Sequence, residues 1–174
     1  MSTFFFFANV IQPNGDCKST QDWIDDFNKI KSWNSEFTTV KLFSTSGCWA
    51  LANAVPAATQ TGFKIWAGLW AIDQAKFGAE KAALEQAIKD HGTGWLAGIN
   101  VGSESLYRKE ISASALAAQI WDVKGMVQIA YGAADVAVGS ADTWTSWVDG
   151  ANVDVINACD VCYPRVIWFV LCTD

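Results

Sequence analysis

The chain has 174 residues, of which 51% are hydrophobic and 17% are charged, so its composition is that of a folded domain with a substantial core. The net charge of −6 argues against nucleic acid and anionic membrane surfaces as partners, because both require clustered lysine and arginine. No stretch reaches the roughly 18 to 20 consecutive apolar residues of a spanning helix, which predicts a protein without a membrane span.

The N-terminal stretch "MSTFFFFANVI" has no basic residue before its apolar part and no small-residue cleavage site, so we do not interpret it as a signal peptide. Its four phenylalanines favour a strand covered on both faces. We therefore predict a buried strand over residues 3–11.

Strand-like runs then alternate with helical segments along the chain. A first helix is predicted over 19–33, with Ser19 as its N-cap and Asp22 three residues later. Later strands are predicted at 37–44, 63–71, 95–102, 135–141 and from about Val161, and helices at 48–62, 73–92, 112–132 and 143–160. This alternation predicts an α/β fold with parallel strands joined by right-handed helical crossovers.

Two architectures fit this pattern, an open doubly wound sheet and a (β/α)8 barrel. No strand is followed by a glycine-rich phosphate-binding loop, which weakens the nucleotide-binding versions of the open sheet. A complete barrel takes about 250 residues, whereas this chain contains about five to six βα units. We expect a single partial domain over residues 1–174.

The cysteines and the histidine give little sign of a metal. Five cysteines are an odd number, which leaves the redox compartment undecided. Cys159 and Cys162 form a C-x-x-C that fits half a zinc site or a redox pair. The only histidine, His91, precedes a glycine at a predicted helix end, where its charge is favourable. We predict no metal and no cofactor.

Functional residues of either architecture gather at the carboxyl ends of the strands. There the sequence places Trp70, Ser103, Glu104, Asp142, Trp144 and Tyr163. Carboxylates can perform acid–base chemistry and aromatic rings can stack on pyranose faces, so these residue types indicate a sugar site. Taken alone, Glu104 also fits a solvated carboxylate at the N-terminus of the next helix. Ser103 has no nearby histidine or other base in the sequence, which argues against a nucleophilic serine.

Other tryptophans fall at helical spacing. We predict that they lie in the core; they are Trp23, Trp33, Trp121 and Trp147.

Four blocks occur in an order that resembles a known family: "FTTVKLFS", "GFKIWAGLWA", "VGSESLYRKEIS" and "VGSADTWTSWVDGANVDVINACD". They are similar to blocks of fungal members of glycoside hydrolase family 17, the glucan endo-1,3-β-glucosidases and related cell-wall glucanosyltransferases. The resemblance covers roughly residues 18 to 160. It implies a (β/α)8 barrel, a β-1,3-glucan substrate, an extracellular or cell-wall location, and retaining chemistry by two glutamates at the ends of strands four and seven.

The resemblance also assigns residues. Glu104 matches the acid/base, and Ser103 stands where many relatives have asparagine. The implied substrate-binding residues are Ser103, Trp70, Asp142, Trp144, Tyr163 and Lys41. Lys41 stands where the family favours arginine, whose planar fork a lysine cannot reproduce. Cys17 and Cys48 would follow neighbouring strands of a barrel, so a disulfide between them is expected in a secreted protein.

The second glutamate of the family has no counterpart here. Retaining chemistry needs the two carboxyl groups about 5 to 5.5 Å apart. The strand that carries the nucleophile would follow residue 174, and the sequence contains no E-T-G-W-like block. Residues from about 161 onward diverge from the family pattern. The chain is therefore expected to be a weak or inactive glucanase; the alternative is a non-catalytic module for glucan binding, interaction or self-assembly.

A partial barrel leaves its first and last strands without neighbours, and such edges can pair with another chain. We therefore expect either a homodimer formed through these edges or closure by "VIWFVLC" against the first strand.

Overall fold

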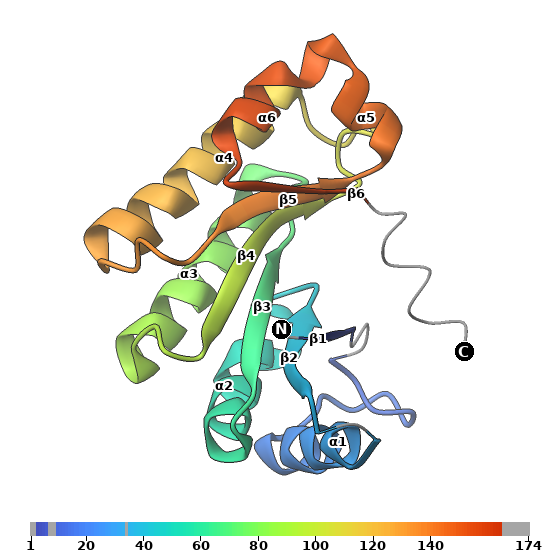
Figure 1. Ribbon diagram of the computed structural model, residues 1–174, viewed down its shortest axis with the longest axis vertical. Helices are drawn as coiled ribbons and strands as arrows, with labels where there is room; N and C mark the ends of the chain where they lie inside the picture. The colour runs from blue at the N-terminus through green and yellow to red at the C-terminus, as the bar shows by residue number, and fades with distance from the viewer. Residues whose placement is uncertain (1–2, 7–9, 34, 165–174) are drawn as a thin grey trace. The chain divides into compact units, whose positions relative to one another are not determined.

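The computed structural model describes residues 3–6, 10–33 and 35–164 (Figure 1). The chain divides into two compact units. Within the described residues, the first unit comprises 3–68 and 79–98, and the second comprises 69–78 and 99–164. In the described part of the chain, no helix is both long and apolar enough to cross a membrane.

The first unit contains three neighbouring parallel strands, in the order β1-β2-β3. Val40 in β2 lies opposite Phe5 in β1 and Ile65 in β3. Ile65 also donates its backbone N–H to the carbonyl of Trp95, just before β4 begins, at 2.8 Å. The elements of this unit are β1 (Thr3–Phe6), α1 (Thr20–Trp33), β2 (Phe37–Leu42), η1 (Gly47–Trp49), α2 (Ala50–Thr61), β3 (Lys64–Leu69) and most of α3 (Gln74–His91).

Helix α1 begins where its capping residues predict. The backbone N–H of Ser19 donates to the Asp22 carboxylate at 2.8 Å, and the N–H of Asp22 donates back to Ser19 Oγ at 3.3 Å. The helix buries Trp23, Phe27 and Ile30, and it packs against α2. This apolar face fixes the helix on the core.

The second unit has the strand order β4-β5-β6, again parallel. Every residue of β5 is buried, as expected for a parallel strand covered on both faces. Helix α4 packs against α6. The elements are β4 (Leu96–Ser103), α4 (Ala113–Lys124), the π-helical η2 (Gly125–Ala130), β5 (Val138–Asp142), α5 (Trp144–Val148), η3 (Gly150–Asn152), α6 (Val153–Ala158) and β6 (Val161–Pro164).

Strand order separates the two architectures that the sequence left open. In each unit the strands follow one another in chain order, and each βα unit adds the next parallel strand. A doubly wound sheet reverses its strand order at a switch point, and no such reversal occurs within either unit of the described chain. The order is that of a (β/α) barrel.

Three predictions about the elements were wrong. The segment 143–160 is not one helix, because Asp149 is extended and its carboxylate caps the N–H of Ala151 at 2.9 Å. The α-helix predicted over 112–132 ends at Lys124 and continues as a π-helical turn. The first strand does not reach Ile11, which instead bridges Cys17 in antiparallel fashion; residues 7–9 lie outside the described residues.

The predicted core tryptophans divide. Trp23 is buried, as predicted. Trp33 and Trp121 are 58% and 54% exposed, so their prediction as core residues was wrong. Trp147 is half-buried. Trp33 and Trp121 therefore lie on the solvent-facing sides of α1 and α4 and not on the sides that pack on the core.

Candidate functional site

Glu104 directly follows Ser103, the last residue of β4. Its φ of 57° lies in the left-handed region, which residues other than glycine rarely adopt. The backbone N–H of Glu104 donates to the carbonyl of Ala141 in β5 at 2.8 Å, and its carbonyl accepts the N–H of Arg108 at 2.9 Å. The end of the neighbouring strand thus holds Glu104 in a conformation that the surrounding structure must stabilise.

Asp142, the last residue of β5, anchors the turn that follows Glu104. Its side chain is 0% exposed. The carboxylate accepts the backbone N–H groups of Leu106 at 2.9 Å, Tyr107 at 3.3 Å and Thr143 at 2.7 Å, and the hydroxyl of Ser146 at 2.8 Å. Asp142 therefore ties the turn after β4 to the start of α5.

Arg108 lies beside Glu104 and joins it to a second glutamate. The guanidinium is 3.8 Å from the Glu104 carboxylate and 3.1 Å from the Glu110 carboxylate. It also donates to the carbonyl of Ser103 at 2.5 Å and lies 5.9 Å from the centre of the Trp70 ring. Glu104 keeps 13% of its side-chain surface exposed. The site is thus a partly open carboxylate with an arginine and an indole around it.

Four of the predicted site residues lie close together in the second unit: Trp70, Ser103, Glu104 and Asp142. Arg108 contacts the first two, and Asp142 binds the turn that follows Glu104. Trp144 is the first residue of α5 and is 58% exposed.

Two further predicted site residues lie within strands. The backbone of Tyr163 lies opposite Ala141 in the β5–β6 ladder. Lys41 belongs to β2 in the first unit, where it is buried with its ammonium 5.2 Å from the Phe43 ring centre.

The sequence alone assigned no role to Arg108 or Glu110. The stretch "SESLYRKE" contains the signal, because Arg108 comes four residues after Glu104 and two before Glu110. A turn rather than a helix connects them, so helical spacing alone would not have placed both glutamates beside the arginine.

A second buried carboxylate, Glu80 on α3, organises the loop after β2 in the first unit. It accepts the hydroxyl of Ser44 at 2.7 Å, the N–H and hydroxyl of Thr45 at 2.5 Å each, and the N–H of Ser46 at 3.0 Å. Burial by itself would raise the pKa of Glu80, but these hydrogen bonds to the ionised form outweigh it and hold the pKa below its ordinary value of 4.5. No motif in the sequence indicates this network.

The loop held by Glu80 leads into the expected disulfide. Cys17 and Cys48 are bonded, which confirms that prediction. Cys48 and Trp49 both have a φ of 52°. The disulfide and the Glu80 network together stabilise this left-handed turn before α2.

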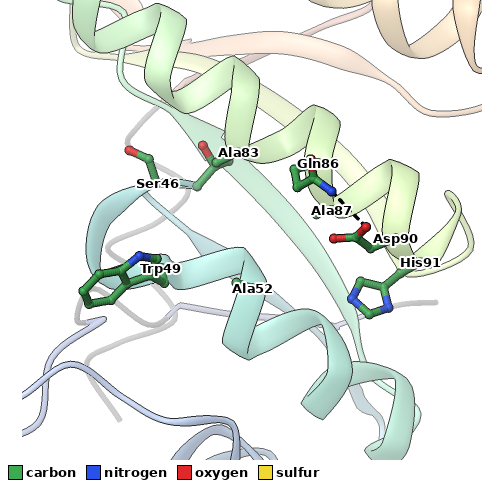
Figure 2. A pocket seen from close by; sticks show the side chains of 9 residues that line it. Ser46, Trp49, Ala52, Ala83, Gln86, Ala87, Asp90 and His91 are labelled. Carbon is green, nitrogen blue, oxygen red and sulfur yellow. Dashed lines mark hydrogen bonds between the residues drawn. The ribbon is translucent and has the colours of Figure 1, made fainter.

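A hollow of about 290 Å³ lies between α2 and α3 in the first unit (Figure 2). Alanines form much of its wall, Trp49 lies at the α2 end of the loop, and Gln86 donates to Asp90 at 2.9 Å. His91 lines the hollow from the last turn of α3, the position that the sequence predicted for it. None of the predicted sugar-binding residues lines this hollow; the lining residues are Thr45, Ser46, Trp49, Ala52, Ala83, Gln86, Ala87, Asp90 and His91.

Among residues 3–6, 10–33 and 35–164, no three histidine, cysteine or carboxylate side chains are grouped so that they could hold a metal ion.

Comparison with known proteins agrees with a glycosidase-type barrel. The family described as the BtgE/BtgC glycoside hydrolase domain matches residues 7–167. A glucan 1,3-beta-glucosidase of Schizosaccharomyces pombe is 37% identical over 160 residues, which are 91% of this chain and 49% of that protein. A protein of the same name from Saccharomyces cerevisiae is 37% identical over 166 residues, or 89% of this chain and 50% of its own length.

A solved structure shows the same fold. The glycoside hydrolase family 17 β-1,3-glucanosyltransferase of Rhizomucor miehei superposes with a TM-score of 0.76 at 25% identity, covering 91% of this chain and 55% of that chain. The parallel strand order and this similarity confirm the predicted TIM-barrel-like α/β fold. The chain spans about half the length of the curated relatives that it matches.

The fold is that of the (β/α)-barrel class of glycoside hydrolases. The chain belongs to the BtgE/BtgC glycoside hydrolase domain family, and the resemblance to fungal glycoside hydrolase family 17 is confirmed.

Proposed function

We propose that this chain binds β-1,3-glucan and that Glu104 is the proton donor of a retaining glycosidase site. The observation that carries the proposal is the left-handed Glu104 at the end of β4, held by Ala141 and by the turn that Asp142 anchors. Catalytic groups of (β/α) barrels occupy this position. The names of the curated relatives, glucan 1,3-beta-glucosidases, support the substrate class.

In this mechanism Glu104 protonates the glycosidic oxygen as the leaving sugar departs. Arg108 and Asp142 act as positioning residues, because they hold the side chain and the turn of Glu104 respectively. The proposed sugar contacts in the second unit are Trp70 and Trp144, by stacking, and Ser103, by hydrogen bonding. Sugar contacts for Tyr163 and Lys41 stay predictions from the family resemblance. A direct sugar contact for Asp142 stays a prediction from the family resemblance.

Retaining hydrolysis also needs a carboxylate nucleophile about 5 to 5.5 Å from the acid. Glu110 forms a 3.1 Å ion pair with Arg108, whose guanidinium also lies 3.8 Å from the Glu104 carboxylate. A carboxylate held in such an ion pair is a poor candidate for attack on the anomeric carbon. The 174 residues on their own should therefore bind glucan and hydrolyse it slowly or not at all.

Binding is tested by titrating laminari-oligosaccharides while tryptophan fluorescence is recorded. We expect a saturable change that Trp144→Phe reduces and Trp33→Phe does not. The two indoles are equally exposed, at 58% each, so Trp33 is a matched control for solvent effects. The absence of any response at millimolar sugar would refute the glucan-binding proposal.

The second candidate is a non-catalytic interaction or self-assembly module. It is favoured by the strand order, in which β1 and β6 each pair with a single strand among the described residues. Its specific form is a homodimer through the first and last strands of the sheet. Light scattering after size-exclusion chromatography distinguishes it: a stable dimer supports self-assembly, and a monomer at all concentrations rejects it.

We also propose an extracellular or cell-wall location. The Cys17–Cys48 disulfide supports it, since disulfides persist chiefly in oxidising compartments. Detection of the protein only in the cytosol of its source cells would contradict this location.

A further inference from the structure

The second unit carries a pair of cysteines that the sugar site does not use. Cys159 is the residue after α6, with its backbone N–H donated to the carbonyl of Val155 at 3.1 Å. Cys162 is the second residue of β6 and lies opposite Ser140 in β5. Both thiols are half-buried and neither is in a disulfide. The C-x-x-C thus spans the junction between the last helix and the last described strand.

The two thiols are in contact. Cys159 donates a hydrogen bond to the sulfur of Cys162, and the backbone at Ser140 contributes a further hydrogen bond to Cys159. The ammonium of Lys124 on α4 lies close to this junction, 3.2 Å from the carbonyl of Ala158 and 2.5 Å from the Asp160 carboxylate. Lys124 thereby fastens α4 to the same junction.

A zinc site does not fit this pair. Zinc requires about four ligands, and within the described ranges no third cysteine, histidine or carboxylate joins the two thiols to form a metal cluster. Of the two interpretations of this C-x-x-C, a zinc site or a redox-active pair of thiols, the redox-active pair remains.

The pair is also unlike a C-x-x-C at a helix N-terminus, where the helix dipole favours a thiolate. Here Cys159 follows the C-terminal end of α6. The hydrogen bond to Cys162 and burial raise the pKa of Cys159, whereas the hydrogen bond from Cys159 lowers the pKa of Cys162. These opposite effects favour Cys162 as the attacking thiol.

We propose that Cys159 and Cys162 form a second disulfide by exchange with a small disulfide such as oxidised glutathione. The Cys162 thiolate attacks one glutathione sulfur, which breaks the glutathione S–S bond and releases one glutathione thiolate. Cys159 then loses its proton and attacks the Cys162 sulfur, which releases the second glutathione. Two protein thiols are oxidised to one disulfide while one oxidised glutathione is reduced to two glutathione molecules.

This disulfide ties α6 to β6, and β6 pairs with β5 along the residues that lead to Asp142. The oxidised form therefore fixes the strand that carries the anchor of the Glu104 turn. The inference does not depend on glucan binding, because it concerns only the thiols.

The test counts free thiols by mass. Cys172 lies outside the described residues, and the variant Cys172→Ser removes its thiol so that it cannot react. The folded chain is equilibrated with oxidised glutathione, denatured without reductant, alkylated with N-ethylmaleimide and weighed. We expect the number of added maleimides to fall from two to zero with no retained glutathione. Two added maleimides, or a stable glutathione adduct, would overturn the proposal.

Single variants test the order of attack. Cys159→Ser leaves Cys162, which should trap glutathione as a stable adduct. Cys162→Ser leaves Cys159, which should form its adduct at least tenfold more slowly at neutral pH. Equal rates for the two variants would contradict Cys162 as the attacking thiol. The Cys17–Cys48 disulfide serves as an internal control, because it should remain intact in every sample.

Discussion

Two carboxylates of this chain, Glu80 in the first unit and Glu104 in the second, show how burial separates structural from chemical groups. Glu80 is 0% exposed and accepts hydrogen bonds from three consecutive loop residues. Glu104 is partly open to solvent, has a left-handed backbone, and lies 3.8 Å from a guanidinium. Glu80 is buried, and both of its oxygens accept hydrogen bonds from the loop after β2, so its role is to support the fold.

Asp142 belongs with Glu80 in this comparison, although it lies beside Glu104. It is fully buried, and its oxygens are occupied by three backbone N–H groups and one hydroxyl. The second unit therefore combines one structural carboxylate, which fixes a turn, with one exposed carboxylate, which that turn presents.

The largest expected effect is that of Glu80→Ala. It leaves the buried donors of Ser44, Thr45 and Ser46 without their acceptor, which should lower the free energy of unfolding by about 4 kcal/mol. The measurement is urea unfolding followed by circular dichroism. Glu85→Ala on the exposed side of the same helix is the matched control and should change stability by less than about 0.5 kcal/mol. A decrease in the free energy of unfolding of less than about 1 kcal/mol for Glu80→Ala would contradict the structural role of Glu80.

Asp142→Ala should have a somewhat smaller effect and lower the free energy of unfolding by about 3 kcal/mol, because some of the N–H groups that it binds can rotate toward solvent. The same change should loosen residues 104–107, which hydrogen exchange at the Leu106 and Tyr107 amides would detect. Asp122→Ala, an exposed aspartate on α4, is the control. Unchanged protection of both amides would show that Asp142 does not hold the turn.

The dependence of stability on pH should sharpen the assignment of Glu80. Its pKa in the folded protein is below 4.5, so its contribution is fully present above pH 4.5 and is lost as the pH falls through the folded-state pKa. The difference in unfolding free energy between the wild type and Glu80→Gln should therefore be constant from pH 7 to pH 5 and shrink below about pH 4.5. A difference that stays constant down to pH 3 would contradict an ionised buried Glu80.

Glu104→Gln should have the smallest effect on stability, less than about 1 kcal/mol, because the variant keeps the size of the side chain and the ion pair to Arg108 that it removes is long, at 3.8 Å. Thermal unfolding of the variant measures this change. A loss as large as that of Glu80→Ala would place Glu104 among the structural carboxylates.

Local sequence signals predicted much of the fold and part of the site. The Ser19–Asp22 capping box, Gly62 after α2 and the alternation of strands and helices all depend on neighbouring residues, and the structure agrees with them. The family motif placed Glu104 at the end of β4.

The contacts that hold the site come from residues far apart in the chain. Glu80 binds residues about 35 positions away, and Asp142 binds Leu106 and Tyr107 at separations of 36 and 35. Periodicity cannot show which strand end meets which loop, so the sequence assigned Asp142 a role only by residue type and motif, and assigned Glu80 none. The break at Asp149 was also missed, because an aspartate that caps a new helical turn interrupts an otherwise helical pattern.

The most direct test of the central claim measures reducing ends released from laminaripentaose by the 174-residue chain, with and without sodium formate as an external nucleophile. If Glu104 is a proton donor without a carboxylate partner in these residues, the chain should release none alone and release sugar slowly in formate, and Glu104→Gln should abolish that release. Rapid release without formate, or equal release by Glu104→Gln, would contradict the account.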